Sequence, residues 1–197
     1  MIPLNAPNLV TFSRIVLIPV IIGIFYVPDA WLAEHGRNIA ATGVFIFAGI
    51  TDWLDGYLAR RLNQMSAFGA FLDPVADKLM VAGALLVLLH LDGGRCHPIF
   101  AFIIIGREIT ISALREWMAQ IGASKSVAVS SLGKIKTAAQ MTAIPMLLYY
   151  DVLFGAIDTR FWGEKLLWLA SVLTVWSMFY YLQKAWPMIK EKSGALG

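Results

Sequence analysis

The sequence predicts an all-α protein, an integral membrane bundle of six transmembrane helices that form a single domain over residues 1–197. The first supporting observation is composition: 58% of residues are hydrophobic, 15% are charged and the mean hydropathy is +0.68, whereas soluble domains carry roughly 25% charged residues. The second is the division of the chain into apolar segments, each close to the roughly 20 residues that cross a bilayer. A third observation, four acidic residues inside these segments, indicates a functional site.

Turn-forming residues separate the six expected helices. Pro28-Asp29, Asp92-Gly93-Gly94 and Gly122 favour turns between apolar segments. The first helix is short by hydropathy, so we expect it to start earlier, with Asn8 as a helix cap after Pro7. The six expected spans are about 11–26, 39–58, 71–91, 98–118, 133–150 and 161–181.

Basic residues predict the orientation of the helices, because cytoplasmic loops carry an excess of Lys and Arg. The connections after the first, third and fifth helices hold four of the 16 Lys and Arg residues, and the other 12 lie at or toward the opposite side. Both termini and the acidic residues are therefore expected on the cytoplasmic side. The net charge of +3 does not indicate a nucleic-acid partner, because no basic cluster is long enough to follow a phosphate backbone.

Four carboxylates lie within 26 residues of largely apolar sequence. Each charge buried in a membrane helix costs about 2.5–3.5 kcal/mol on insertion scales, so four of them without partners are hard to accommodate. Bound divalent cations are the simplest explanation. The motif reads Asp52-x-x-Asp55-Gly56-x-x-Ala59-Arg60, then eight residues, then Gly69-x-x-x-Asp73-x-x-x-Asp77.

The spacing of the motif supports metal binding. Residues three or four apart share a helix face, so Asp52 lies beside Asp55 and Asp73 beside Asp77. Two such faces opposite each other would form an all-oxygen site suited to Mg²⁺ or Mn²⁺. Arg60 offers a fork for phosphate.

Two residues near the motif have alternative interpretations. Asp73 precedes Pro74, and this pair is typical of a helix start, with Asp as the cap and Pro at the first helical position. The acidic neighbours favour metal ligation, and both roles can hold together. Ser66 either contacts a phosphate or only caps the next helix.

Basic residues in the fourth and fifth helices are candidates for binding an acceptor phosphate. Arg107 lies inside an apolar run, where it is costly unless paired or functional, and Glu108 is about 100° away on the helix and is not expected to pair with it. Lys134 and Lys136 cannot both point inward, and we expect Lys134 to do so. Arg115 and Lys136 have an alternative role as interfacial residues.

The eight fixed residues of the motif resemble, without departure, the signature of the CDP-alcohol phosphotransferases. The resemblance continues at the N-terminus, in Asn8-Leu9-x-Thr11-x-x-Arg14. The segments 106–118 and 126–141 are similar to the bacterial phosphatidylglycerophosphate synthases of that family.

This resemblance implies a six-helix, usually dimeric enzyme among the membrane lipids of the bacterial inner membrane. It implies transfer of the phosphatidyl group of CDP-diacylglycerol to sn-glycerol 3-phosphate, which yields phosphatidylglycerol phosphate and CMP. By resemblance, Asp77 is also the general base. Two Mg²⁺ or Mn²⁺ ions would be held by Asp52, Asp55, Asp73 and Asp77, and the CDP pocket would be lined by Gly56, Ala59, Arg60 and Gly69.

Two alternatives remain open at this point. An inositol phosphate acceptor also requires basic residues, and only the similarity in the fourth and fifth helices favours glycerol phosphate. A divalent-cation transporter would also place Asp residues in a membrane, but the acidic residues here gather toward one side.

Overall fold

The computed structural model describes residues 6–61, 67–91, 93–120, 122 and 131–194. These residues form six α-helices and a short β-hairpin, so the all-α prediction is confirmed. The elements are α1 (Ala6–Ile24), α2 (Glu34–Arg61), α3 (Ala67–His90), α4 (Pro98–Gln120), α5 (Ser131–Tyr149), β1 (Val152–Leu153), β2 (Ile157–Asp158) and α6 (Thr159–Gly194).

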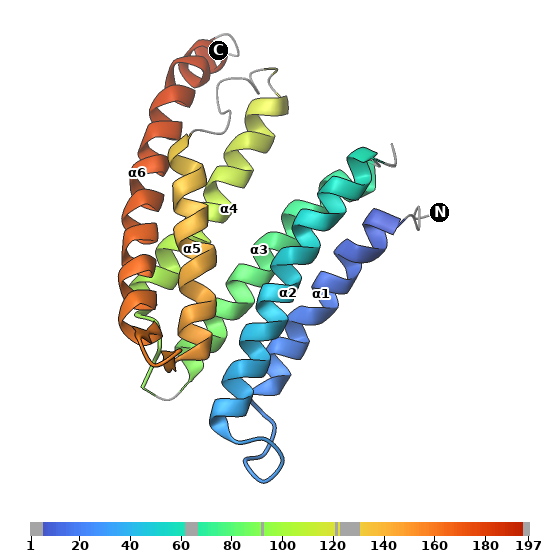
Figure 1. The fold of residues 1–197 in the computed structure, drawn as a ribbon. Coiled ribbons are helices and arrows are strands. Elements are labelled where there is room, and N and C mark those ends of the chain that lie inside the picture. The colour runs from blue at the N-terminus through green and yellow to red at the C-terminus, as the bar shows by residue number, and fades with distance from the viewer. Residues whose placement is uncertain (1–5, 62–66, 92, 121, 123–130, 195–197) are drawn as a thin grey trace.

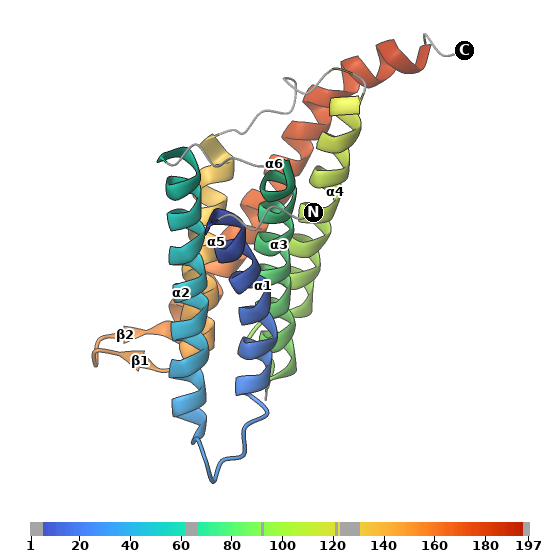
Figure 2. The same cartoon turned by 90° about the vertical axis from the view of Figure 1, so that its right-hand side faces the viewer.

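The helices form two groups that meet at one end and spread apart at the other. Helices α1, α2 and α3 make one group, and α4, α5 and α6 make the other (Figures 1 and 2). The start of α1 and the end of α6 lie at the open end of the molecule, whereas the β-hairpin lies toward the closed end. The groups diverge toward the end where α2 finishes and α3 begins, and a pocket lies in the space between them.

The apolar core joins the two groups below this space. Its buried side chains come from all six helices and include Phe45, Leu85, Ile104, Leu147 and Leu167. A second, smaller cluster links only α4 to α6. It consists of Ile111, Leu114, Met118, Tyr181 and Ala185.

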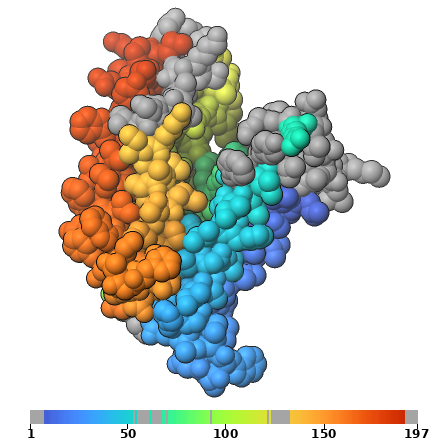
Figure 3. Space-filling model, viewed as in Figure 1, coloured from blue at the N-terminus to red at the C-terminus, as the bar shows by residue number. Residues whose placement is uncertain are grey.

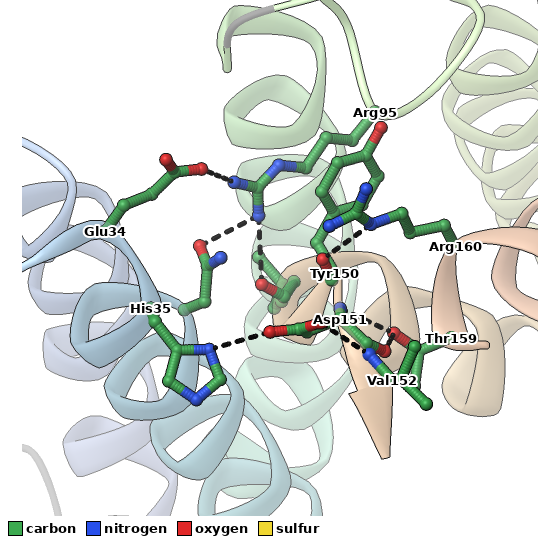
Figure 4. Close-up of polar contacts among 10 residues, drawn as sticks. Glu34, His35, Arg95, Tyr150, Asp151, Val152, Thr159 and Arg160 are labelled. Carbon is green, nitrogen blue, oxygen red and sulfur yellow. Dashed lines mark hydrogen bonds and ion pairs between the residues drawn. The ribbon is translucent and has the colours of Figure 1, made fainter. Parts of the chain in front are cut away.

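A polar cluster around Arg95 joins the connections at the closed end (Figure 4). Arg95 is buried, donates to Asn38 Oδ1 at 2.9 Å and to the Leu148 carbonyl at 3.1 Å, and pairs with Glu34 at 3.1 Å. Its guanidinium also lies 4.3 Å from the centre of the Tyr150 ring. Burial lowers the pKa of Arg95 and Glu34 opposes that shift. One side chain therefore ties α2, the α3–α4 connection and the end of α5 together.

The β-hairpin between α5 and α6 was not expected from the sequence. Val152 pairs with Asp158 and Leu153 with Ile157 in antiparallel register. At its base, the Thr159 hydroxyl donates to the Asp151 carbonyl at 2.7 Å and accepts from the Asp151 amide at 3.1 Å. The hairpin was missed because each strand is only two residues long and gives no alternating pattern.

Each expected span overlaps one helix, but the helix ends differ. For example, α6 ends at Gly194 rather than near residue 181, because a helix continues into polar residues beyond the apolar segment that hydropathy detects. The cap assigned to Asn8 is wrong, since α1 already begins at Ala6 and Asn8 is buried within it. The alternative role of Asp73 as a helix cap is also wrong, because α3 begins at Ala67 and Pro74 lies inside the helix.

Hydropathy of the described helices gives one clear candidate for a membrane span. The segment Thr159–Lys190 is long and apolar enough to cross a bilayer by length and composition, and Asn8–Ile24 is a shorter apolar helix.

Replacing Arg95 tests the role of the polar cluster. Arg95→Met leaves the Asn38 and Leu148 oxygens without their donor, so we expect a loss of about 2–4 kcal/mol in the free energy of unfolding. For a chain of this length, this corresponds to a decrease of roughly 5–15 °C in Tm. Thermal unfolding of the purified protein measures the effect, with the exposed Lys165→Met as control. An unchanged Tm in Arg95→Met would contradict the role.

Candidate active site

Three carboxylates of the acidic motif surround a single buried guanidinium, that of Arg14 in α1. The Arg14 side chain is only 1% exposed, whereas those of Asp52, Asp73 and Asp77 are 44%, 45% and 48% exposed. Arg14 Nη1 contacts Asp52 Oδ1 and lies 2.5 Å from Asp77 Oδ1, and Nη2 lies 3.7 Å from Asp73 Oδ1. The guanidinium therefore balances part of the negative charge of these carboxylates from their buried side, and part of each carboxylate side chain stays exposed.

Helix α1 supplies a polar stripe that faces the carboxylates. Asn8, Thr11 and Arg14 follow one another at three-residue spacing, and all three are buried. The Thr11 hydroxyl donates to Asp73 Oδ1 at 2.7 Å.

Close contact between α1 and α3 depends on Gly83, where a Cβ atom would come within 2.9 Å of Ile18 Cγ2.

A second charged group lies on the other side of the space, on α4 and α5. Glu108 Oε1 accepts from Lys136 Nζ at 2.5 Å and from Arg107 Nη1 at 3.1 Å. Lys136 and Arg107 are buried, and Glu108 is 25% exposed. The guanidinium of Arg107 also lies 5.7 Å from the centre of the Tyr181 ring of α6. Two cations thus share one carboxylate at the wall of the space.

A pocket of about 260 Å³ lies between these two groups. The space-filling view shows the molecule hollowed between α5 and α2 (Figure 3). One wall carries the carboxylates of α2 and α3, and the other carries the α4–α5 charges, so a ligand here contacts both. The lining residues are Asp52, Asp77, Lys78, Met80, Val81, Glu108, Lys136, Thr137, Gln140 and Met141.

The predicted metal and nucleotide residues fall partly within the described side chains. Asp52, Asp73 and Asp77 lie around Arg14, and Gly69 is buried in the first turns of α3. Helix α2 continues through Arg61, so the helical prediction around Asp55-Gly56 is confirmed. The side chains of Asp55, Gly56, Ala59 and Arg60, and the whole of Ser66, lie outside the described part of the structure.

The four basic candidates for the acceptor phosphate lie in different environments. Lys136 lines the pocket, and Arg107 lies behind it against Glu108. Lys134 is exposed, so the expectation that it points inward in place of Lys136 is wrong. Arg115 is exposed as well, with its guanidinium 5.6 Å from the centre of the Tyr181 ring.

The direction of Lys136 has a simple cause in helical periodicity. Gln140, Ala143 and Leu147 are all buried on α5, and this stripe extends back to Lys136. The sequence carried that signal, because the three residues follow Lys136 at steps of three and four. The expectation that Glu108 does not pair with Arg107 is also wrong, because the long Arg107 side chain reaches around α4 to the same oxygen that Lys136 uses.

Arg14 was recognised only as part of the N-terminal resemblance, and its position among the carboxylates was not predicted from the sequence. An arginine in an apolar helix is a signal in itself, because it requires a partner or a function. Its spacing from Asn8 and Thr11 predicts one polar face. No rule of local sequence, however, identifies carboxylates some 40 to 60 residues away as its partners.

The donor set of this region fits a hard divalent cation. Carboxylate oxygens are the ligands that Mg²⁺ and Mn²⁺ prefer, and Asp52, Asp73 and Asp77 each keep nearly half of their side chain exposed. Among the described side chains alone, no group of three or more His, Cys, Asp or Glu residues is close enough to form a metal site. Arg14 lies between the three carboxylates, and the fourth, Asp55, is outside the described side chains.

Fold and site together define a helical protein with an acidic phosphotransfer motif. The chain belongs to the CDP-alcohol phosphatidyltransferase family, whose model matches residues 4–176. Several bacterial relatives carry the name CDP-diacylglycerol–glycerol-3-phosphate 3-phosphatidyltransferase. The protein from Pseudomonas fluorescens is 49% identical over 191 residues, which cover 95% of this chain and 93% of the relative. Those from Salmonella choleraesuis (strain SC-B67) and Escherichia coli (strain K12) are each 46% identical over 181 residues, which cover 92% of this chain and 94% of the relative.

Replacing Arg14 tests whether it balances the carboxylates. Arg14→Met leaves three nearby negative charges without their cation, and we expect a loss of about 1–3 kcal/mol, below the cost for fully buried pairs because the carboxylates are partly exposed. The decrease in Tm should be partly reversed in the double variant Arg14→Met with Asp52→Asn, because one repelling charge is then gone.

The matched control combines Arg14→Met with Glu164→Gln, which removes an exposed carboxylate at the other end of the bundle. This control should not restore the Tm. Equal recovery in both double variants, or no loss in Arg14→Met, would contradict a balancing role.

Proposed function

We propose that this chain transfers the phosphatidyl group of CDP-diacylglycerol to sn-glycerol 3-phosphate, giving phosphatidylglycerol phosphate and CMP. The observation that carries the proposal is the pocket, in which Asp52 and Asp77 of the signature face Lys136 and Glu108. Family membership supports the nucleotide-linked lipid as donor. The names of the relatives support glycerol 3-phosphate as acceptor.

Residues on the two walls of the pocket have different roles in the proposed reaction. Asp77 accepts the proton of the attacking acceptor hydroxyl. The hydroxyl oxygen forms a bond to the phosphorus attached to diacylglycerol, the pyrophosphate bond to CMP breaks, and CMP leaves with the bridging oxygen. Lys136, supported by Arg107, holds the acceptor phosphate on the opposite wall, while Lys134 and Arg115 attract it from outside. The protein contributes mainly positioning and charge, as in other phosphoryl transfers.

A nucleotide and metal site at the α2–α3 wall is part of the proposed reaction. Asp52, Asp55, Asp73 and Asp77 are the residues that would hold two Mg²⁺ or Mn²⁺ ions, which would neutralise the pyrophosphate and the leaving CMP. The remaining motif residues would contact CDP. These are Gly56, Ala59, Arg60 and Gly69, with Ser66 from the α2–α3 connection.

We also place the helices in the bacterial inner membrane, with the pocket and both termini on the cytoplasmic side. Large apolar side chains that point away from the bundle support this placement, since water would solvate them poorly. Phe102, Trp176 and Phe179 are 74%, 66% and 64% exposed. Surrounding lipid would cover these surfaces, and a homodimer, as the resemblance implies, would cover part of them.

An acceptor panel tests the proposed reaction. Purified protein in mixed micelles with CDP-diacylglycerol should release CMP only when sn-glycerol 3-phosphate and Mg²⁺ or Mn²⁺ are both present. Inositol 1-phosphate and serine serve as alternative acceptors. Turnover with inositol 1-phosphate and none with glycerol 3-phosphate would overturn the acceptor, and metal flux into liposomes without CMP release would favour a transporter.

The role of Asp77 is tested by Asp77→Asn. A carboxamide cannot take up the proton at neutral pH, so we expect CMP release to fall by at least about 100-fold, the lower range for general base catalysis. Binding of CDP-diacylglycerol and the Tm should remain near wild type. The control, Asp158→Asn on the hairpin, should keep full activity. A residual rate within tenfold of wild type would assign the base to another group.

A further inference from the structure

Within the part of the chain that the structure describes, Glu108 accepts its side-chain hydrogen bonds through one of its two carboxylate oxygens. Lys136 and Arg107 both bind Oε1, at 2.5 Å and 3.1 Å. Among the described residues, both side-chain hydrogen bonds that reach the Glu108 carboxylate end on Oε1 rather than Oε2. An ionised carboxylate has about four acceptor positions, and Glu108 lines the pocket with a quarter of its side chain exposed. One acceptor oxygen is therefore available beside the ammonium of Lys136.

Gln140 is a second polar group of the same wall. It lies one turn after Lys136 on α5, is only 4% exposed and lines the same pocket. Its Oε1 atom is buried and has no hydrogen-bond partner among the described residues. A buried polar group without a partner costs about 1–3 kcal/mol, and a ligand in the pocket can supply the missing bond when the carboxamide turns toward it.

The charges of this wall match a small phosphate ester that carries hydroxyl groups. Lys136 and Arg107 together exceed Glu108 by one positive charge, which favours a phosphate. Carboxylate and amide oxygens accept hydrogen bonds, which favours hydroxyl donors. In glycerol 3-phosphate, the non-reacting hydroxyl is on the carbon next to the one that carries the phosphate. A phosphate on Lys136 therefore brings that hydroxyl beside Glu108.

We propose that Glu108, assisted by Gln140, selects the acceptor by accepting a hydrogen bond from its non-reacting secondary hydroxyl. This inference rests on the proposed function and extends it from the phosphate to the rest of the acceptor. The acceptor is then held at three points: its reacting hydroxyl at Asp77, its phosphate at Lys136 and its second hydroxyl at Glu108. A pocket of about 260 Å³ suits a molecule of that size.

The test compares two acceptors that differ only in this hydroxyl. These are sn-glycerol 3-phosphate and 3-hydroxypropyl phosphate, which has the same reacting hydroxyl and the same phosphate. The ratio of their kcat/KM values isolates the secondary hydroxyl. For the wild type we expect glycerol 3-phosphate to be favoured by about 10- to 100-fold, as for a hydrogen bond to a charged group.

Glu108→Gln is the informative variant, because its one carbonyl oxygen remains with Lys136 and Arg107 and an NH₂ group replaces Oε2. The ratio should fall to less than a third of the wild-type value. Any weaker hold on Lys136 lowers both kcat/KM values together and cancels in the ratio. Glu116→Gln, an exposed residue two turns further along α4, is the matched control and should keep the wild-type ratio.

Two further measurements separate the outcomes. The KM for CDP-diacylglycerol and the Tm report whether Glu108→Gln is folded. If it is not folded, Gln140→Met replaces it, and we expect the ratio of the two kcat/KM values to fall about threefold. A wild type that uses both acceptors equally, or a folded variant that keeps the wild-type ratio, would overturn the inference. Failure of the wild type to use glycerol 3-phosphate at all would instead overturn the proposed function.

Discussion

The organisation of this protein depends on one buried guanidinium that lies among three carboxylates. Arg14 of α1 contacts Asp52 of α2 and lies within 2.5–3.7 Å of Asp77 and Asp73 of α3. Helices rich in apolar residues can carry these acids near one another because part of the negative charge is balanced from within the protein. The exposed parts of Asp52 and Asp77 line a pocket, where cations and phosphates can complete the charge balance.

The rest of the fold joins the two helix groups at one end of the molecule and leaves the pocket open toward the other end. The apolar core and the Arg95 cluster hold the two helix groups together at the closed end. Toward the open end, the charged groups of α2 and α3 face those of α4 and α5 across the pocket, which has a volume of about 260 Å³. Under the proposed function, the acidic α2–α3 wall would hold the anionic donor through bound cations. Lys136 and Arg107 give the α4–α5 wall a net positive charge that suits the anionic acceptor.

The helices, and the grouping of the acidic residues on helix faces, could be predicted from the sequence because both depend on local patterns. Apolar segments mark helices, and three- or four-residue spacing places Asp73 and Asp77 on one face. Predictions failed where a side chain is governed by distant partners. Arg14 was missed as the centre of the cluster, and Lys134 was preferred to Lys136, because the neighbouring α4 and its Glu108 determine which lysine is buried. Helix ends were also misplaced, since hydropathy detects apolar residues and not hydrogen-bonded turns.

We propose above all that the signature carboxylates around Arg14 form a cation site beside the pocket. Anomalous diffraction from crystals of the protein soaked with Mn²⁺ would test it most directly. We predict anomalous density beside Asp52, Asp73 and Asp77, with the Arg14 guanidinium still packed beneath them. Mn²⁺ bound only elsewhere on the protein, or carboxylates that point away from one another in the metal-bound crystal, would contradict the claim.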